Sequence, residues 1–234
     1  MIDHLHLAVT DQAKAVEWYH KYFNAEITPE GTERVMFGTT RMIFQLNKAP
    51  KPSEHSVLEL IGISVSDVDG TIKRLQSDGV TVVAPVQTVE GLKVAQVVDP
   101  WGTLINVVQD PQKLGLHHIC LATPDPVASL AWFADKFGGK VEKFKGQDAI
   151  NYGGVWLIGA QGDSEPSGGH AIDHMGMRPL NVDAAVAALK AKNVKVTTEP
   201  RPLTLSGGAT MRLAFIEGPS GVRIELVQRD NVKN

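Results

Sequence analysis

The stretch LHHICLATPD at residues 116–125 repeats the start of the chain, IDHLHLAVTD at residues 2–11. The repeat extends through both halves of the sequence at a shift of 114 residues, which pairs His4 with His118, Asp11 with Asp125, Trp18 with Trp132 and Asp69 with Asp183. Near the C-terminus the shift grows to 119, because the loop around residues 201–210 is longer in the second copy. Such self-similarity indicates duplication. We predict two homologous domains, 1–110 and 116–230.

Each half divides again into two similar units. A unit begins with an alternating strand, continues with an Asp or Asn N-cap and an amphipathic helix, and ends with short strands separated by turn residues. The four units span residues 1–50, 57–110, 116–165 and 171–230. Four β-α-β-β-β units predict an α+β protein whose strands curl in pairs into two half-open, cup-shaped barrels. We expect each half of the chain to form its own cup.

The bulk composition excludes several classes of partner. The chain has 234 residues, 43% of them hydrophobic, and a formal net charge of −3. It has neither a basic stripe for nucleic acid nor an apolar run long enough to span a membrane. A single cysteine, Cys120, and a first strand without signal-peptide features favour the cytoplasm. We expect a monomer or homodimer that binds a small molecule.

Three side chains of the second half could hold a metal ion. Alternation along a strand puts His118 and Cys120 on one face, and Glu225 on the same face as Arg223. If the third and fourth units share a cup, His118, His174 and Glu225 can converge on its floor. Two imidazoles and one carboxylate form a facial triad with open metal positions. From spacing alone, purely structural histidines remain an alternative.

These motifs resemble the vicinal oxygen chelate superfamily, which includes glyoxalase I, extradiol dioxygenases and bleomycin-binding proteins. The similarity lies in the pattern H-x-x-L-A-x-x-D before a Trp-bearing helix, present twice, and in GPSGVRIEL at residues 218–226. The resemblance implies that His118, His174 and Glu225 bind a divalent metal. A facial set of two imidazoles and a carboxylate favours Fe(II) or Mn(II), with Zn(II) and Ni(II) as alternatives.

The resemblance also implies that the first half binds no metal. Its matching positions hold His4, Leu60 and Asn106, with Gln45 as a weak neighbour. Leucine cannot bind a metal and a neutral amide is a poor substitute for a carboxylate. His4 is therefore expected to be a relic of the duplication or a packing residue, and replacing it is expected to leave the metal in place.

Several other residues are candidates for the pocket. Arg178 and Arg223 could bind a substrate carboxylate or phosphate, or instead extend to solvent at the rim. Cys120 could be a fourth ligand or a nucleophile, although a buried, inert thiol fits its surroundings better. Tyr152, Thr210 and Phe215 could border the pocket and contact a substrate. His117 is expected to face away from His118.

The resulting functional hypothesis is a metal-dependent enzyme for a small, oxygen-rich, anionic substrate. The alternatives are an extradiol-type dioxygenase and a non-catalytic binding protein like those of bleomycin resistance. Thr210 and Phe215 stand where the extradiol motif has an acid-base pair of His and Tyr, which counts against catechol cleavage. The segment VWLIGAQGD at 155–163 offers no fourth metal ligand, which counts against glyoxalase and epimerase chemistry.

Overall fold

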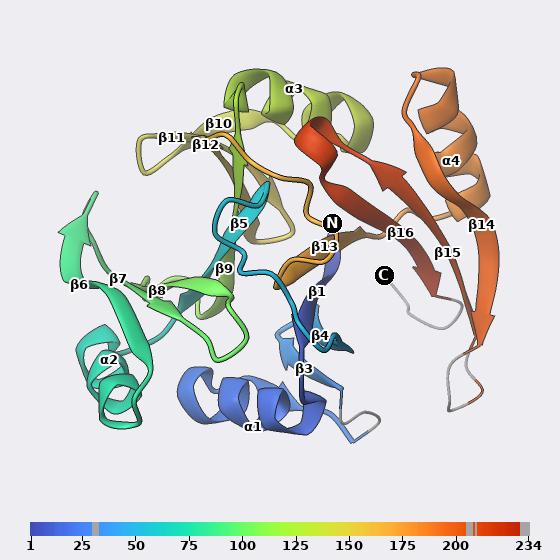
Figure 1. The fold of residues 1–234 in the computed structure, drawn as a ribbon. Coiled ribbons are helices and arrows are strands. Elements are labelled where there is room, and N and C mark those ends of the chain that lie inside the picture. Colours follow the sequence, from blue (N-terminus) through green and yellow to red (C-terminus); the bar gives the residue numbers. More distant parts are fainter. Residues whose placement is uncertain (30–32, 205–207, 209, 230–234) are drawn as a thin grey trace.

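A computed structural model describes residues 1–29, 33–204, 208 and 210–229, which fold into two eight-stranded sheets with helices packed on them (Figure 1). The predicted α+β class and the four repeated units are confirmed. In each sheet the first strands of two units pair antiparallel at the centre, and the remaining strands extend outward on both sides.

The first sheet combines the first and the fourth units. In spatial order its strands are β14 (Val196–Thr204), β15 (Thr210–Glu217), β16 (Arg223–Arg229), β13 (Ile172–Met177), β1 (Ile2–Val9), β4 (Thr40–Leu46), β3 (Arg34–Phe37) and β2 (Glu26–Ile27).

The second sheet combines the third and the second units. In spatial order its strands are β10 (Val141–Phe144), β11 (Gln147–Tyr152), β12 (Val155–Gln161), β9 (Gly115–Thr123), β5 (Leu58–Ser64), β8 (Leu104–Gln109), β7 (Leu92–Val98) and β6 (Thr81–Val89).

The prediction that each half of the chain forms its own cup is therefore wrong. Residues 47–57 join the first unit to the second, and residues 162–171 join the third unit to the fourth. Both segments cross from one sheet to the other, and they run side by side. Lys51 forms a parallel bridge with His170, and Ser56 forms one with Glu165. These backbone hydrogen bonds stabilise the exchanged pairing, in which the first unit pairs with the fourth and the second with the third. Since all four units are alike, the repeat itself does not distinguish the two ways of pairing them.

Within the described residues, four α-helices, each capped by a side chain, cover one face of the sheets. They are α1 (Gln12–Phe23), α2 (Val68–Ser77), α3 (Pro126–Phe137) and α4 (Val182–Ala191). The carboxylates of Asp11, Asp67 and Asp125 and the amide of Asn181 each accept a hydrogen bond from a backbone N–H of the first turn. Among the described residues, no helix is long and apolar enough to cross a membrane.

The main hydrophobic core lies between the helices and the sheets. Leu5 and Leu7 of β1 point into this core, whereas His4 and His6 point to the opposite face. The phenol of Tyr19 on α1 donates a 2.8 Å hydrogen bond to Asp99, which follows β7, so the core connects both sheets. We call the helix-free face of the first sheet the first cup and that of the second sheet the second cup.

Candidate metal centre

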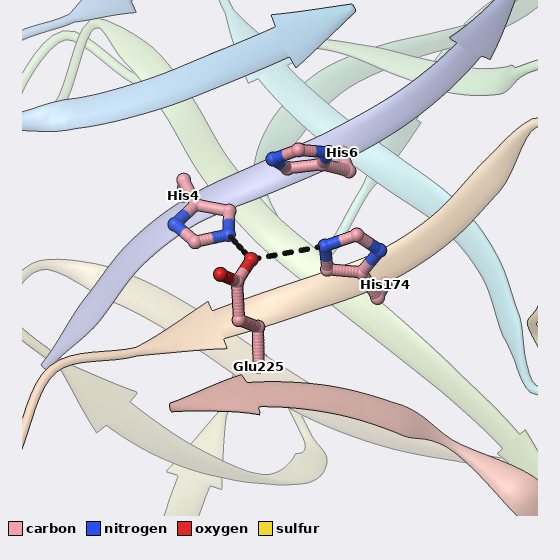
Figure 2. A group of neighbouring side chains, drawn as sticks. All are labelled: His4, His6, His174 and Glu225. Atoms are coloured by element: carbon pink, nitrogen blue, oxygen red, sulfur yellow. Dashed lines mark hydrogen bonds and ion pairs between the residues drawn. The ribbon is translucent and has the colours of Figure 1, made fainter. Parts of the chain in front are cut away.

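Four potential metal ligands converge in the first cup. His4 and His6 come from β1, His174 from β13 and Glu225 from β16, and their ligand atoms all lie within 4.8 Å of one another. Figure 2 shows the carboxylate of Glu225 directed at the rings of His4 and His174. Its Oε2 atom lies 2.9 Å from Nε2 of His4 and 3.2 Å from Nε2 of His174.

These spacings fit a shared cation. Two ligands that each lie about 2.1 Å from one ion are about 3 Å apart when they occupy adjacent positions. His6 stacks on His174 with ring centroids 4.2 Å apart, and within the described structure its buried Nδ1 atom has no hydrogen-bond partner. A buried polar atom without a partner is costly, and a cation would satisfy it.

Two β-bulges place a carboxylate behind each of two imidazoles. In β1, Ile2 lies opposite Met177 but His4 lies opposite Gly176, so Asp3 is an extra residue. Because the bulge breaks the alternation, Asp3 reaches the ring of its own neighbour. The Nδ1 atom of His4 donates to Asp3 over 2.8 Å. The carboxylate thereby fixes the ring orientation and leaves Nε2 facing Glu225.

The second bulge repeats this arrangement in β13. His6 lies opposite His174 and Leu7 lies opposite Ile172, which makes Asp173 the extra residue. The Nδ1 atom of His174 donates to Asp173 over 2.6 Å. Metal-binding imidazoles commonly donate their other ring N–H to a carboxylate, as His4 and His174 do here.

The charged groups of the cluster stabilise one another despite their burial. Burial raises the pKa of Glu225, but hydrogen bonds with His174 and His4 outweigh it and hold this pKa below its usual value. Burial likewise raises the pKa of Asp173, yet contacts with His174 and a backbone N–H lower it to about 2. Burial lowers the pKa of His6 well below its ordinary value, so its imidazole is neutral and can bind a metal.

Arginines surround the cluster on the same face. Arg41, Arg178 and Arg229 all bind the buried carboxylate of Asp3. Arg223 binds Asp173 and lies over the ring of Phe215, 4.4 Å from its centroid. Of these four side chains, three share a single carboxylate, so the cup carries excess positive charge. Arg178 and Arg223 thus lie beside the cluster, and their binding of a substrate stays a prediction.

The structure does not bring His118 to His174 and Glu225. His118 belongs to β9 of the second sheet, because the third unit pairs with the second and not with the fourth. His4, expected to be a packing residue, takes the position beside Glu225. The candidate centre therefore draws ligands from both halves of the chain, contrary to the expected location in the C-terminal half. His117 does not face away from His118, since their Nδ1 atoms are 2.8 Å apart.

Two other sequence candidates also lie in the second sheet. Cys120 packs with Leu60 and Leu104, and burial raises the pKa of its thiol to about 12. This environment favours the inert thiol over a ligand or nucleophile. The hydroxyl of Tyr152 donates to the carbonyl oxygens of Phe133 and Gly138, so this residue supports α3 and does not border the first cup.

The two positions compared with the extradiol motif separate in the structure. Phe215 contacts His174 edge-on, with ring centroids 5.2 Å apart, and so belongs to the candidate centre. Thr210 lies at the start of β15, opposite Thr204 and away from the cluster. Gln45 lies on β4 opposite Ala8 of β1, the strand that also carries His6.

Sequence reasoning missed His6, Asp3 and Asp173. A signal for His6 was present, because the alternation in His-Leu-His places residues 4 and 6 on one face. The two aspartates directly precede His4 and His174, where regular alternation predicts the opposite face. Only the bulges bring them to the imidazoles.

The Glyoxalase/Bleomycin resistance protein/Dioxygenase superfamily model matches residues 1–107 and 115–226. The chain belongs to this superfamily. Glyoxalase I from Zea mays is similar in structure, with a TM-score of 0.78, 18% identity and coverage of 97% of this chain and 92% of that one. A putative dioxygenase from Bacillus subtilis gives a TM-score of 0.65 at 11% identity, covering 98% of this chain and 85% of that one. At these identities the similarity shows the fold. Curated protein sequences gave no significant match.

Proposed function

We propose that the first cup holds one divalent metal ion and that the protein is a metalloenzyme for a small, anionic, oxygen-rich substrate. The observation that carries this proposal is the convergence of three imidazoles and a carboxylate, His4, His6, His174 and Glu225, within 4.8 Å. Membership of the glyoxalase superfamily supports it. Three nitrogen donors favour Fe(II), Ni(II) or Zn(II) over Mn(II), which prefers oxygen.

The protein supplies the geometry of the centre. Asp3 and Asp173 hold the rings of His4 and His174 so that both Nε2 atoms face Glu225. Rigid outer carboxylates of this kind raise metal affinity and fix ligand orientation. A bound divalent ion would polarise two adjacent substrate oxygens and stabilise negative charge that develops on them.

The arginines favour an anion. Arg223 has a side chain 39% exposed, which leaves its guanidinium accessible at the edge of the cup. Arg41, Arg178 and Arg229 are more deeply placed and share Asp3, so their positive charge exceeds what this one carboxylate neutralises. A carboxylate or phosphate on the substrate would complete this balance.

Phe215 argues against ordinary catechol cleavage. Its ring lies against His174, at the position where the extradiol motif has a tyrosine. A phenyl ring can act neither as an acid nor as a base. We therefore propose that simple catechols are not ring-opened by the Fe(II)-loaded protein. Accumulation of the coloured ring-opened product would instead favour the dioxygenase alternative.

The direct test combines metal analysis with a matched pair of small chelators. Elemental analysis of the purified chain should give one divalent metal per molecule. Glycolate and glycolamide offer the same two oxygens and differ in charge. Calorimetric titration of the metal-loaded protein should show glycolate binding at least about tenfold more tightly, as expected for a charge-assisted contact.

The controls separate the parts of this proposal. Metal-free protein should bind glycolate much more weakly, because the chelating interaction is lost. Equal affinity with and without metal would favour the non-catalytic binding protein. Equal affinity for glycolate and glycolamide would contradict the anionic substrate and leave the metal assignment in place. A chain without metal affinity would refute the centre itself.

A further inference from the structure

The second cup contains a cavity of about 300 Å³ that the candidate metal centre does not use. This volume is at the lower end of the range typical of small-molecule sites. Gln96, Asn106, His117 and His118 form a continuous polar row in its wall, and the other polar or charged lining residues are Gln87, Glu90, Lys145 and Gln147. The residues of the row are joined by hydrogen bonds and lie on β7, β8 and β9 of the second sheet.

The hydrogen bonds run in one direction along this polar row. Asp110 has a carboxylate that can only accept, so Nε2–H of His117 donates to it over 3.3 Å. Nδ1 of His117 must then accept from Nδ1–H of His118, 2.8 Å away. This leaves Nε2 of His118 to accept from the amide of Asn106 at 3.3 Å, whose oxygen accepts from Gln96 at 3.1 Å.

The row is uncharged where it meets the cavity. Burial lowers the pKa of His118 to about 3, and burial also lowers that of His117, so both rings are neutral. The Asn106 and Gln96 amides each have two N–H groups, of which the row uses one. Asn106 and Gln96 therefore each keep one N–H donor that the row does not use. Two such donors suit a neutral carbonyl oxygen.

The remaining walls of the cavity are largely apolar. Val94 and Val108 lie beside the polar row, and Phe144 forms an aromatic wall that stacks on Trp156 with centroids 4.5 Å apart. The hairpins at Glu90–Gly91 and Lys145–Gly146 meet at the mouth, where a Cβ at Gly146 would lie 3.9 Å from the Glu90 carboxyl carbon. Among the described lining residues, these two turns supply the one acidic and the one lysine side chain.

Strand register shows which residues of the second cup take the places of the glutamate and the arginines of the first cup. His118 opposite Gly62 matches His4 opposite Gly176, which places Asn106 where the first cup has Glu225. The same register replaces all four arginines of the first cup, namely Arg41 by Trp156, Arg178 by Ser64, Arg223 by Leu104 and Arg229 by Asp110.

We propose that the second cup is a separate, metal-independent binding site for a neutral, flat molecule that carries a carbonyl group. The carbonyl oxygen accepts from the Asn106 and Gln96 amides, and the flat body packs between Phe144 and the valines. A charged group would lie on an uncharged floor without a counter-ion, which carries a large desolvation cost. This site acts independently of the metal centre proposed above.

Three probes of nearly equal shape test the charge preference. Benzamide is neutral, benzoate is an anion and benzamidinium is a cation. Titration of the full chain, followed by ¹H–¹⁵N NMR of side-chain amides, should shift the Asn106 and Gln96 signals with benzamide. Benzoate and benzamidinium should bind this site at least about tenfold more weakly, because neither finds a buried counter-ion. Removing metal with a chelator should leave benzamide affinity unchanged.

Two variants keep the test decisive. Asn106→Leu removes one amide donor at similar volume and should weaken benzamide about tenfold. Val94→Trp fills the cavity and should abolish binding. Both should keep the dispersed backbone ¹H–¹⁵N NMR spectrum of the parent chain, which shows that they are folded. Benzamide that shifts no second-cup signal, binds no better than benzoate, or binds Val94→Trp as well as the parent would overturn the proposal.

Discussion

The two cups share one backbone plan and differ in nearly every chemically active side chain. Each places a histidine opposite a glycine at the junction of its central strands, His4 opposite Gly176 and His118 opposite Gly62. A Cβ on either glycine would lie 2.1 Å from the facing imidazole, so the ring occupies the space that the missing side chain leaves. Glycine at this position therefore explains how an imidazole fits across the junction in both cups.

The two cups diverge in the chemistry built around that shared histidine. In the first cup the neighbours are His174 and Glu225, and in the second they are Leu60 and Asn106. The bulge before the histidine holds Asp3 in one cup and His117 in the other. One scaffold thus supports a charged cluster in the first cup and a neutral, directional hydrogen-bond row in the second.

Removal of a predicted ligand should give the largest difference between the cups. Glu225→Ala and His174→Ala should each lower metal affinity by more than about a hundredfold, because a direct ligand matters more than an outer-shell partner. The register-matched variants Asn106→Ala and Leu60→Ala should leave it unchanged. Metal content after dialysis, measured by elemental analysis, checks both pairs.

The same experiment separates the two shared histidines. His4→Ala should lose the metal and His118→Ala should retain it, since only His4 lies beside Glu225. The opposite outcome would mean that the exchanged pairing of units does not hold in solution.

A second prediction transfers the first cup's ligands to the second. The double substitution Leu60→His with Asn106→Glu places an imidazole and a carboxylate around His118 at the register positions of His174 and Glu225. This variant should bind a second metal ion, more weakly than the first because His117 stands behind His118 where Asp3 supports His4. Calorimetric titration with Zn(II) would show two classes of site, whereas the control Leu60→Met with Asn106→Gln should show one.

A third prediction concerns the carboxylate behind His174. Asp173→Asn keeps the shape of the side chain but replaces the carboxylate that accepts from Nδ1 of His174 with a neutral amide. Metal affinity should therefore fall by roughly 10- to 100-fold. Glu59 occupies the equivalent bulge of the second sheet, and Glu59→Gln should leave metal affinity unaltered. Competition with a fluorescent chelator measures both variants. Equal losses in the two would show that the effect comes from general destabilisation.

The smallest expected effect tests the packing that both cups share. Gly62→Ala should reduce the free energy of unfolding by about 1–3 kcal/mol, as other overpacking substitutions do. His118→Ala removes the clashing ring, so the glycine substitution should cost much less in that background. Urea denaturation of the four proteins in this cycle gives the coupling. If Gly62→Ala costs as much in the His118→Ala background as in the parent, the backbone at residue 62, and not the imidazole of His118, requires glycine.

The sequence alone determined the units of this protein and much of its candidate site. The repeated strand pattern, the caps at Asp11, Asp67, Asp125 and Asn181 and the family motifs are local properties. They predicted the units and two of the four clustered side chains, His174 and Glu225. Alternation also placed His4 and His6 on one face. These features depend on neighbours within a few residues, which a repeat in the sequence makes visible.

Tertiary structure decided which units share a sheet and which carboxylates reach the imidazoles. Four similar units can pair in more than one way with nearly the same strand contacts, and the choice rests on hydrogen bonds between the crossing segments, such as those joining Lys51 to residues 169 and 171. The positions of Asp3 and Asp173 rest on bulges, which are set by the register between β1 and β13. Such long-range registers leave no periodic mark in the sequence. The sequence therefore did not show that the histidine beside Glu225 is His4 and not His118.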